Sequence, residues 1–178
     1  FMKGPSPLKS LKKISSLRHD HPVKKFVESR RIPNTAHFEL FFAPKFYEWV
    51  NKVVPNKFPS LKGDHPRLVI PFFDENNKMF AFQGRAFGNE QPKYITIKLN
   101  PEKDKIYGLN RLNRDKPIYV VEGPIDSLFL DNCIAVAGAD FSKLPKENTT
   151  IVFDNERRNK EILKQIEKTV NEGYKIVL

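Results

Sequence analysis

The sequence predicts an α/β protein, with a parallel sheet flanked by helices in the second half of the chain and a smaller, basic mixed α/β subdomain before it. Over residues 118–178, short β-branched runs alternate with helical patterns, which is typical of parallel sheets. Charge divides the same way: residues 1–31 carry nine Lys and Arg against two acids, and residues 116–178 carry nine against ten. This asymmetry is expected if the front holds a polyanion while the back holds metal.

The front of the chain contains a tail and two helices. Residues 1–17 are rich in Lys, Ser and Pro, and we interpret them as a basic, mostly flexible linker. The subdomain over 18–114 then begins with a helix that opens around Pro22. A second helix is predicted over 44–54, where aromatic and aliphatic residues recur at helical spacing until Pro55 stops it. We interpret Trp49 in this helix as a core residue rather than a platform for base stacking.

Three strands are predicted in the rest of this subdomain. They cover residues 68–73, 78–85 and 93–99, and the Asp-Glu-Asn-Asn turn at 74–77 joins the first two. A polar linker over 113–116 ends the subdomain.

The second subdomain, 115–178, has the alternating pattern. Strands are expected at 118–121, 134–137, 150–153 and 174–178. One helix is expected to run from Pro124 through Leu130, and another over 157–172, where Ile162, Leu163, Ile166 and Val170 would be buried. Gly173 stands where a residue that ends a helix should be.

Acidic residues follow two of these strands. Glu122 ends the first strand, and Asp154 and Glu156 follow the third. The carboxyl ends of parallel strands meet at one sheet edge, where ligands bind in open α/β sheets. Three converging carboxylates repel one another unless a cation lies between them, and hard oxygen donors suit Mg²⁺ or Mn²⁺. Asp126 is a second-shell group, a ligand of a second metal, or an acid that helps a helix to start. Asp140 is explained by turn chemistry.

These motifs resemble a known family. A strand ending in Glu122-Gly-Pro-Ile-Asp126, followed about thirty residues later by an acidic triplet, is similar to the TOPRIM domain of topoisomerases and primases. Arg67-Leu-Val-Ile-Pro-Phe72, Gly84-Arg-Ala86, Pro92-Lys-Tyr94 and Tyr107-Gly-Leu109, in that order, resemble the catalytic core of bacterial-type DNA primases, above all the bacteriophage versions.

The resemblance implies a function and a set of roles. It implies synthesis of short RNA primers on single-stranded DNA during replication, with Mg²⁺ or Mn²⁺ held by Glu122, Asp126, Asp154 and Glu156. Ribonucleoside triphosphates would be substrates, and a replicative helicase would be a partner. Template or triphosphate would be bound by basic and polar residues facing the acids: Arg67, Arg85, Lys93, Lys98, Asn110 and Arg111.

The chain departs from the family pattern in two places. The family ends its second acidic motif in Asp-x-Asp, whereas this chain has Asp154-Asn155-Glu156. The side chain of Glu156 must therefore reach one methylene further or bind differently. The family also has a third acidic cluster after the next strand. We therefore expect the TOPRIM subdomain to be truncated at its C-terminus.

Two other functions remain open. A TOPRIM nuclease would use the same acids to degrade DNA, and a catalytically silent module would bind nucleic acid without turnover. Template-directed incorporation of ribonucleotides separates a primase from a nuclease. Loss of turnover in Glu122→Gln with DNA affinity intact would exclude the silent module.

Composition excludes several other classes. The single cysteine, Cys133, rules out an internal disulfide and a multi-cysteine zinc site, so a cytoplasmic location is expected, that of the host if the protein is phage-encoded. No apolar run approaches the roughly 18 residues of a membrane span. A phosphate-binding Walker loop is also absent from the sequence.

Overall fold

The computed structural model describes residues 6–137, 144–154 and 160–177. Its internal contacts divide the chain into two compact units. We call residues up to Pro71 with Ala81–Leu99 the basic unit, and Phe72–Phe80 with the residues from Asn100 onward the parallel-sheet unit. The basic unit holds 17 Lys and Arg against 6 acids, net +11, and the other unit 14 against 15, net −1. The division therefore passes through a hairpin and after Leu99, whereas the sequence suggested a boundary at 114/115.

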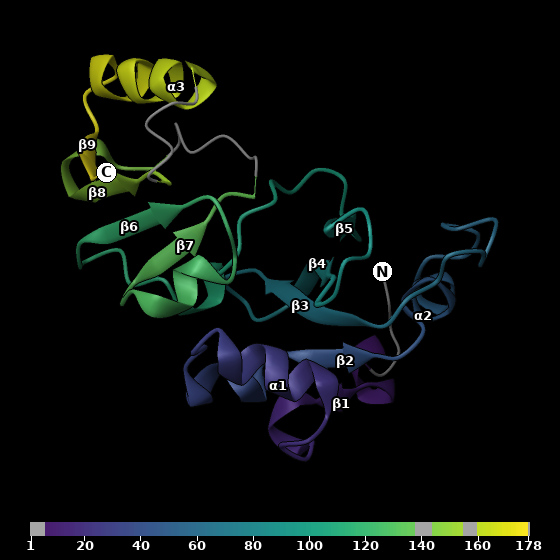
Figure 1. Cartoon of the computed structure of the whole chain (residues 1–178). Helices are drawn as coiled ribbons and strands as arrows, with labels where there is room; N and C mark the ends of the chain where they lie inside the picture. Colours follow the sequence, from purple (N-terminus) through teal and green to yellow (C-terminus); the bar gives the residue numbers. More distant parts are fainter. Residues whose placement is uncertain (1–5, 138–143, 155–159, 178) are drawn as a thin grey trace. The chain divides into compact units, whose positions relative to one another are not determined.

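The basic unit is built on an antiparallel sheet with the strand order β1-β2-β3-β4-β5 (Figure 1). The strands are β1 (Lys12–Lys13), β2 (Phe41–Ala43), β3 (Arg67–Phe73), β4 (Met79–Arg85) and β5 (Tyr94–Lys98). Two α-helices accompany it, α1 (Pro22–Ser29) and α2 (Phe46–Val53). The 3₁₀ turns η1 (Pro7–Ser10), η2 (Ile14–Ser16) and η3 (Asn34–Phe38) complete it. Both expected helices and all three expected strands are confirmed within one or two residues.

The core of this unit forms around Phe46 on α2. Phe46 is fully buried, and its ring centroid lies 6.3 Å from that of Phe82. A Cβ added at Gly84 would collide with the Phe46 ring, so glycine is needed there for space. Trp49 is 5% exposed and packs on Phe82 with ring centroids 4.7 Å apart, which confirms it as a core residue.

The expected linker over residues 1–17 differs from the structure where it is described. Residues 7–16 contain two 3₁₀ turns and strand β1, which pairs with β2. Leu8 and Ile14 are buried. Burial of these two aliphatic side chains anchors a segment whose polar composition suggested a tail.

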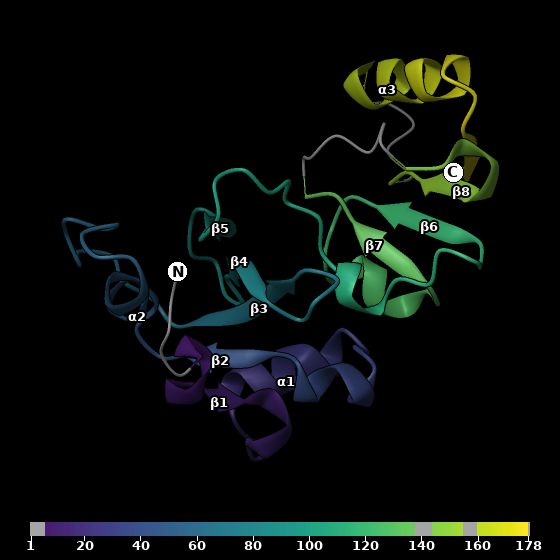
Figure 2. The ribbon, with the colours of Figure 1, turned by 180° about the vertical axis from the view of Figure 1, so that it is seen from behind.

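The parallel-sheet unit contains the predicted parallel sheet, with the order β7-β6-β8-β9. The strands are β6 (Ile118–Val121), β7 (Cys133–Ala135), β8 (Thr149–Val152) and β9 (Lys175–Val177). Helix α3 (Lys160–Asn171) contacts β9, and Figure 2 shows the helix above β8. Short turns η4 (Leu109–Arg111), η5 (Asp126–Phe129) and η6 (Lys146–Asn148) connect these elements. No helix among the described residues is long and apolar enough to cross a membrane.

Two details of this unit were predicted wrongly. The chain after Glu122 forms the single 3₁₀ turn η5 rather than a helix through Leu130, and the Ser127 hydroxyl there donates to the Pro124 carbonyl at 2.7 Å. In α3, Leu163 and Val170 are 49% and 50% exposed. Thr169 is buried instead. Leu163 and Val170 recur at helical spacing, and so do Ile162, Gln165 and Thr169, which line the pocket described below. Periodicity alone could therefore not choose between the two faces of the helix.

Candidate functional site

The structure brings Glu122 and Asp154 to one edge of the parallel sheet. Glu122 follows β6 directly, and Asp154 lies two residues beyond β8. The two strands run parallel, with Val120 paired to Ile151, so both carboxylates leave the sheet at its carboxyl edge. Both residues are exposed and line the same pocket, which has a volume of about 400 Å³. The strand pattern predicted this placement of the two acids at one edge, and their role as metal ligands stays a prediction.

The sheet fixes the backbone at Glu122. The Glu122 carbonyl accepts a hydrogen bond of 3.0 Å from the Ala137 amide, and the Val121 carbonyl accepts one of 3.1 Å from Val136. A Cβ added at Gly123 would collide with the Asp126 carboxylate. Asp126 is exposed and opens η5. Glycine at this position thus leaves room for the Asp126 carboxylate, which lies over its backbone.

The pocket has an apolar floor and a polar wall. Val120 and Ile151 come from the sheet, and Val136 directly follows β7. Helix α3 supplies Ile162 and three polar residues, Gln165, Lys168 and Thr169, and Glu172 directly follows the helix. Lys168 lies 3.7 Å from Glu172. The polar wall was not predicted from the sequence, although its members recur at helical spacing after the acidic triplet.

The chemistry of the two acids fits a divalent cation. Within the described residues, neither Glu122 nor Asp154 forms an ion pair or a side-chain hydrogen bond. Exposed carboxylates of this kind offer hard oxygen donors to Mg²⁺ or Mn²⁺. No group of three or more His, Cys, Asp and Glu residues that could hold a metal occurs in the described part of the chain. Glu156 and Asp140 lie outside it.

The predicted nucleic-acid ligand Arg67 is fully buried inside the basic unit. Its Nη1 donates to the Gly84 carbonyl at 3.2 Å, and its guanidinium lies 5.7 Å from the centroid of the Phe46 ring. Its Nε and Nη2 groups have no hydrogen-bond partner among the residues that the structure describes. Burial lowers the pKa of Arg67 below its ordinary value. In this arrangement Arg67 holds the strand that leads into Arg85.

Arg85 is also buried, at 3% exposure, and lies between two rings. Its guanidinium carbon is 4.5 Å from the centroid of Tyr94 and 5.6 Å from that of Phe26. Lys93 and Lys98, by contrast, are exposed. Of the four basic residues predicted in this unit, two are therefore directly accessible to phosphate.

Arg111 and Asn110 belong to the other unit. The Arg111 guanidinium lies 4.5 Å from the centroid of Tyr107 and donates to the Ser127 hydroxyl at 3.3 Å. Because Ser127 follows Asp126 in η5, Arg111 is a cation near the acidic loop. Gly108 has a φ of 93°, which favours glycine, and a Cβ there would crowd the Arg111 guanidinium. Asn110 donates to the Asn77 side chain at 3.2 Å.

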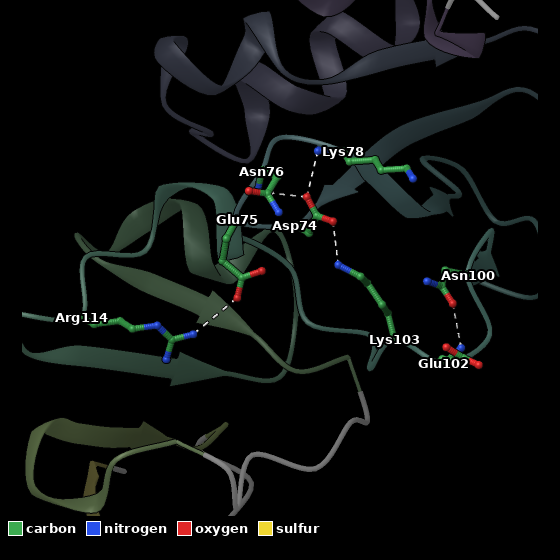
Figure 3. A network of polar contacts seen from close by, with 8 residues as sticks. All are labelled: Asp74, Glu75, Asn76, Lys78, Asn100, Glu102, Lys103 and Arg114. Carbon is green, nitrogen blue, oxygen red and sulfur yellow. Dashed lines mark hydrogen bonds and ion pairs between the residues drawn. The ribbon is translucent and has the colours of Figure 1, made fainter. Parts of the chain in front are cut away.

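A polar network fixes the turn between β3 and β4 within the parallel-sheet unit (Figure 3). The Asp74 carboxylate accepts from the backbone amides of Asn76 and Lys78 and from Lys103 Nζ at 2.6 Å. The bond from Lys103 is the main cause that lowers the pKa of Asp74. Arg114 pairs with Glu75 at 3.4 Å. These residues have a structural role.

Comparisons with known proteins agree with this geometry. No family model matches. The chain is 40% identical over 174 residues to a DNA primase of Enterobacteria phage T4, an alignment that covers 96% of this chain and 50% of the T4 protein. The chain thus spans about half the length of that relative. Its sequence similarity to DNA primases confirms the resemblance that the motifs indicate.

Solved structures show the same fold. A DNA primase domain from Pseudomonas aeruginosa matches with a TM-score of 0.67 and 19% identity, over 94% of this chain and 66% of that one. A DnaG primase catalytic domain bound to single-stranded DNA matches with a TM-score of 0.65 and 19% identity, over 91% and 63%. The fold is that of primase catalytic domains.

Proposed function

We propose that this chain is the catalytic core of a DNA primase, a DNA-directed RNA polymerase that makes short RNA primers on single-stranded DNA during replication. The observation that carries the proposal is the convergence of Glu122 and Asp154 on one pocket at the carboxyl edge of a parallel sheet. The 40% identity to the T4 primase supports it. We place the activity in the cytoplasm, that of the host if the gene belongs to a phage.

Two acids of the pocket would hold Mg²⁺ or Mn²⁺. Glu122 and Asp154 are the proposed ligands, and Asp126 and Glu156 are proposed as further ones. When bound, the metal supplies Lewis-acid stabilisation of charge on the α-phosphate and favours ionisation of the attacking 3′-hydroxyl. The protein contributes a fixed backbone at Glu122, through its bond from Ala137. A ligand that is already in place does not have to be reorganised during the reaction. Preorganised groups of this kind stabilise the charge that develops in the transition state.

The basic unit would bind the template and the incoming nucleotide. Its net charge of +11 favours a polyanion. Lys93 and Lys98 are the proposed phosphate ligands because they are exposed, whereas Arg67 and Arg85 would act mainly by holding the surface in shape. Arg111 and Asn110 are proposed to contact the nucleotide near the acidic loop. A similar catalytic domain was solved with single-stranded DNA bound. Ribonucleoside triphosphates as substrates and a replicative helicase as partner are part of this proposal.

The test compares Glu122→Gln with Glu147→Gln. Glu147 is an exposed acid of the same unit on η6, so it controls for the loss of one charge. We expect Glu122→Gln to lower ribonucleotide incorporation on single-stranded DNA by about 10²–10³-fold, as loss of one charge-stabilising group does, and to weaken Mn²⁺ binding measured by electron paramagnetic resonance. Glu147→Gln should change neither.

The other functions give different outcomes. Metal-dependent degradation of DNA without incorporation would identify a nuclease and overturn the proposal. If the unchanged chain and Glu147→Gln bind DNA but show neither turnover nor Mn²⁺ binding, the chain is a silent module.

A further inference from the structure

A buried hydroxyl closes the acidic loop, which runs from Glu122 to Ser127. Ser127 is the second residue of η5 and is 1% exposed. Its Oγ donates to the Pro124 carbonyl at 2.7 Å, and its backbone amide donates to the Gly123 carbonyl at 3.2 Å. Both acceptors lie between Glu122 and Asp126, the two acids of this loop that are proposed metal ligands. Ser127 therefore fixes the backbone that connects them.

The same hydroxyl accepts a second bond from outside the loop. Arg111 Nη2 donates to Ser127 Oγ at 3.3 Å, between residues 16 positions apart in the chain. A serine that bonds a carbonyl three residues before it is ordinary turn chemistry, but turn chemistry does not explain the bond from Arg111. A buried hydroxyl costs free energy unless it is bonded, so burial alone would be met better by an apolar side chain. The Ser127 hydroxyl is used both as donor and as acceptor, and it joins the acidic loop to a cation.

Arg111 is itself held by the segment before it. Tyr107 is 3% exposed and exchanges two backbone hydrogen bonds with Ala135 on β7, at 2.8 and 3.0 Å. The Arg111 amide donates to the Gly108 carbonyl at 3.2 Å, and its guanidinium rests on the Tyr107 ring. Strand β7 pairs with β6, which leads directly into the acidic loop. Arg111 and the acidic loop are thus fixed to neighbouring strands of one sheet.

Nucleotidyl transfer needs metal ligands and cations in a fixed relation, because both stabilise charge on the same phosphates. A misplacement of about 1 Å can lower the rate by about 10²-fold. We propose that Ser127 is a positioning residue for primer synthesis, whose hydroxyl holds Glu122 and Asp126 in place relative to Arg111. This inference rests on the proposed function and deepens it, because Ser127 acts through the proposed ligands rather than on the substrate.

The first test compares Ser127→Ala with Thr149→Val. Thr149 begins β8 and is fully buried, and its hydroxyl has no hydrogen-bond partner among the described residues, so it controls for the loss of a buried hydroxyl. We expect Ser127→Ala to lower kcat for ribonucleotide incorporation and to weaken Mn²⁺ binding, measured by electron paramagnetic resonance, each by about 10-fold, as loss of a group that orients metal ligands does. The KM for single-stranded DNA should not change, because the proposed template ligands belong to the basic unit. Thr149→Val should change none of the three.

A second arm tests the link to Arg111. Arg111→Met removes the donor of the bond to Ser127 and keeps an unbranched side chain. If the hydroxyl acts through this bond, Ser127→Ala should lower kcat by clearly less than about 10-fold in the Arg111→Met background, because two groups that act together are not additive. An equal fractional loss of kcat in both backgrounds would overturn the inference.

The outcomes separate this inference from the proposed function. Activity is measured below the urea concentration and temperature at which any variant begins to unfold. If Ser127→Ala is less stable but keeps its kcat and Mn²⁺ affinity, Ser127 is an ordinary turn residue and the inference fails. The proposed function still stands in that case if Glu122→Gln loses both incorporation and Mn²⁺ binding. If Glu122→Gln loses neither, the proposed function fails, and the inference fails with it.

Discussion

The two units of the chain hold their charged side chains in opposite ways. In the basic unit, Arg67 and Arg85 are 0% and 3% exposed and lie against aromatic rings, although the unit carries a net charge of +11. In the parallel-sheet unit, with a net charge of −1, Glu122 and Asp154 are exposed and line a pocket. The two acids lie just beyond the C-terminal ends of their strands, β6 and β8. The two arginines lie within the paired strands β3 and β4, so their side chains lie on the faces of the sheet. Net charge therefore favours the basic unit as the one that binds a polyanion, but it does not identify which of its cations are accessible.

The largest expected effect tests whether the two acids act together. If Glu122 and Asp154 hold one ion, either Glu122→Gln or Asp154→Asn alone removes the site, and each should lower primer synthesis by about 10²–10³-fold. The double variant should be little worse than either single one, because residues that act as a unit are strongly non-additive. Single-turnover incorporation assays on all three proteins measure this. If the loss of primer synthesis in the double variant equals the product of the two single losses, the acids act separately.

Arg67 sharpens the comparison from the side of the basic unit. Because its side chain is fully buried, Arg67→Ala leaves a cavity and should lower the free energy of unfolding by about 2–4 kcal/mol, as other large-to-small core substitutions do. Lys57→Ala, at an exposed position of the same unit, should stay within about 0.5 kcal/mol. Urea denaturation gives both values. An unchanged stability of Arg67→Ala together with a loss of DNA binding would show that Arg67 is a phosphate ligand.

Substitution of one glycine in each unit compares a buried with an exposed neighbour of the added methyl group. In Gly84→Ala the Cβ collides with the buried Phe46 ring, and in Gly123→Ala with the exposed Asp126 carboxylate. A buried ring has little room to move, so Gly84→Ala should cost about 1–3 kcal/mol of stability. Gly123→Ala should cost less, since the carboxylate can swing into solvent, but it should reduce activity by displacing Asp126. Thermal unfolding and incorporation assays separate the two effects. Equal stability losses would contradict this account.

The smallest expected effect is a dependence of stability on pH. His37 in the basic unit is 3% exposed, with Nδ1 at 3.2 Å from Lys24 Nζ and Nε2 at 3.1 Å from the Ile32 carbonyl. Burial is the main cause that lowers the pKa of His37, and Lys24 also lowers it, while Glu28 and the bond to Ile32 raise it. The folded state thus binds fewer protons than the unfolded state, and stability falls as the pH drops below about 6.5, the ordinary pKa of histidine.

In the parallel-sheet unit, the lowered pKa of Asp74 makes stability depend on pH in a more acidic range. It contributes stability above the usual carboxyl pKa, and this stability is lost as the pH falls further. Urea unfolding at pH 7.5, 5.5 and 3.5 measures both windows. His37→Gln should remove only the first loss. An unchanged fall in stability between pH 7.5 and 5.5 in that variant would assign the effect to another group.

The sequence predicted the parallel sheet and its acidic edge because both follow from local pattern. The run Ile118–Val121 is apolar and bounded by turn residues, so it could only be a short strand, and Glu122 had to leave it at its carboxyl end. Gly173 has a φ of 87°, in the left-handed conformation that its place after the last helix predicted.

What the sequence could not predict depends on contacts between distant residues. The burial of Arg85 depends on Tyr94 and Phe26, and that of Ile14 on the strand β2 that its segment pairs with. Two rows of residues on α3 have similar spacing, so the sequence could not show which row faces the sheet. The polar wall of the pocket, with Gln165 and Lys168, was missed for the same reason. The roles of Glu156 and of the basic residues remain predictions.

The most direct test of the central claim is anomalous diffraction from crystals of the chain soaked in Mn²⁺. If the two acids form one metal site, an anomalous peak should lie between the carboxylates of Glu122 and Asp154, with an oxygen of each within about 2.5 Å of the ion. A peak elsewhere, or one that contacts only one of the two carboxylates, would contradict the account.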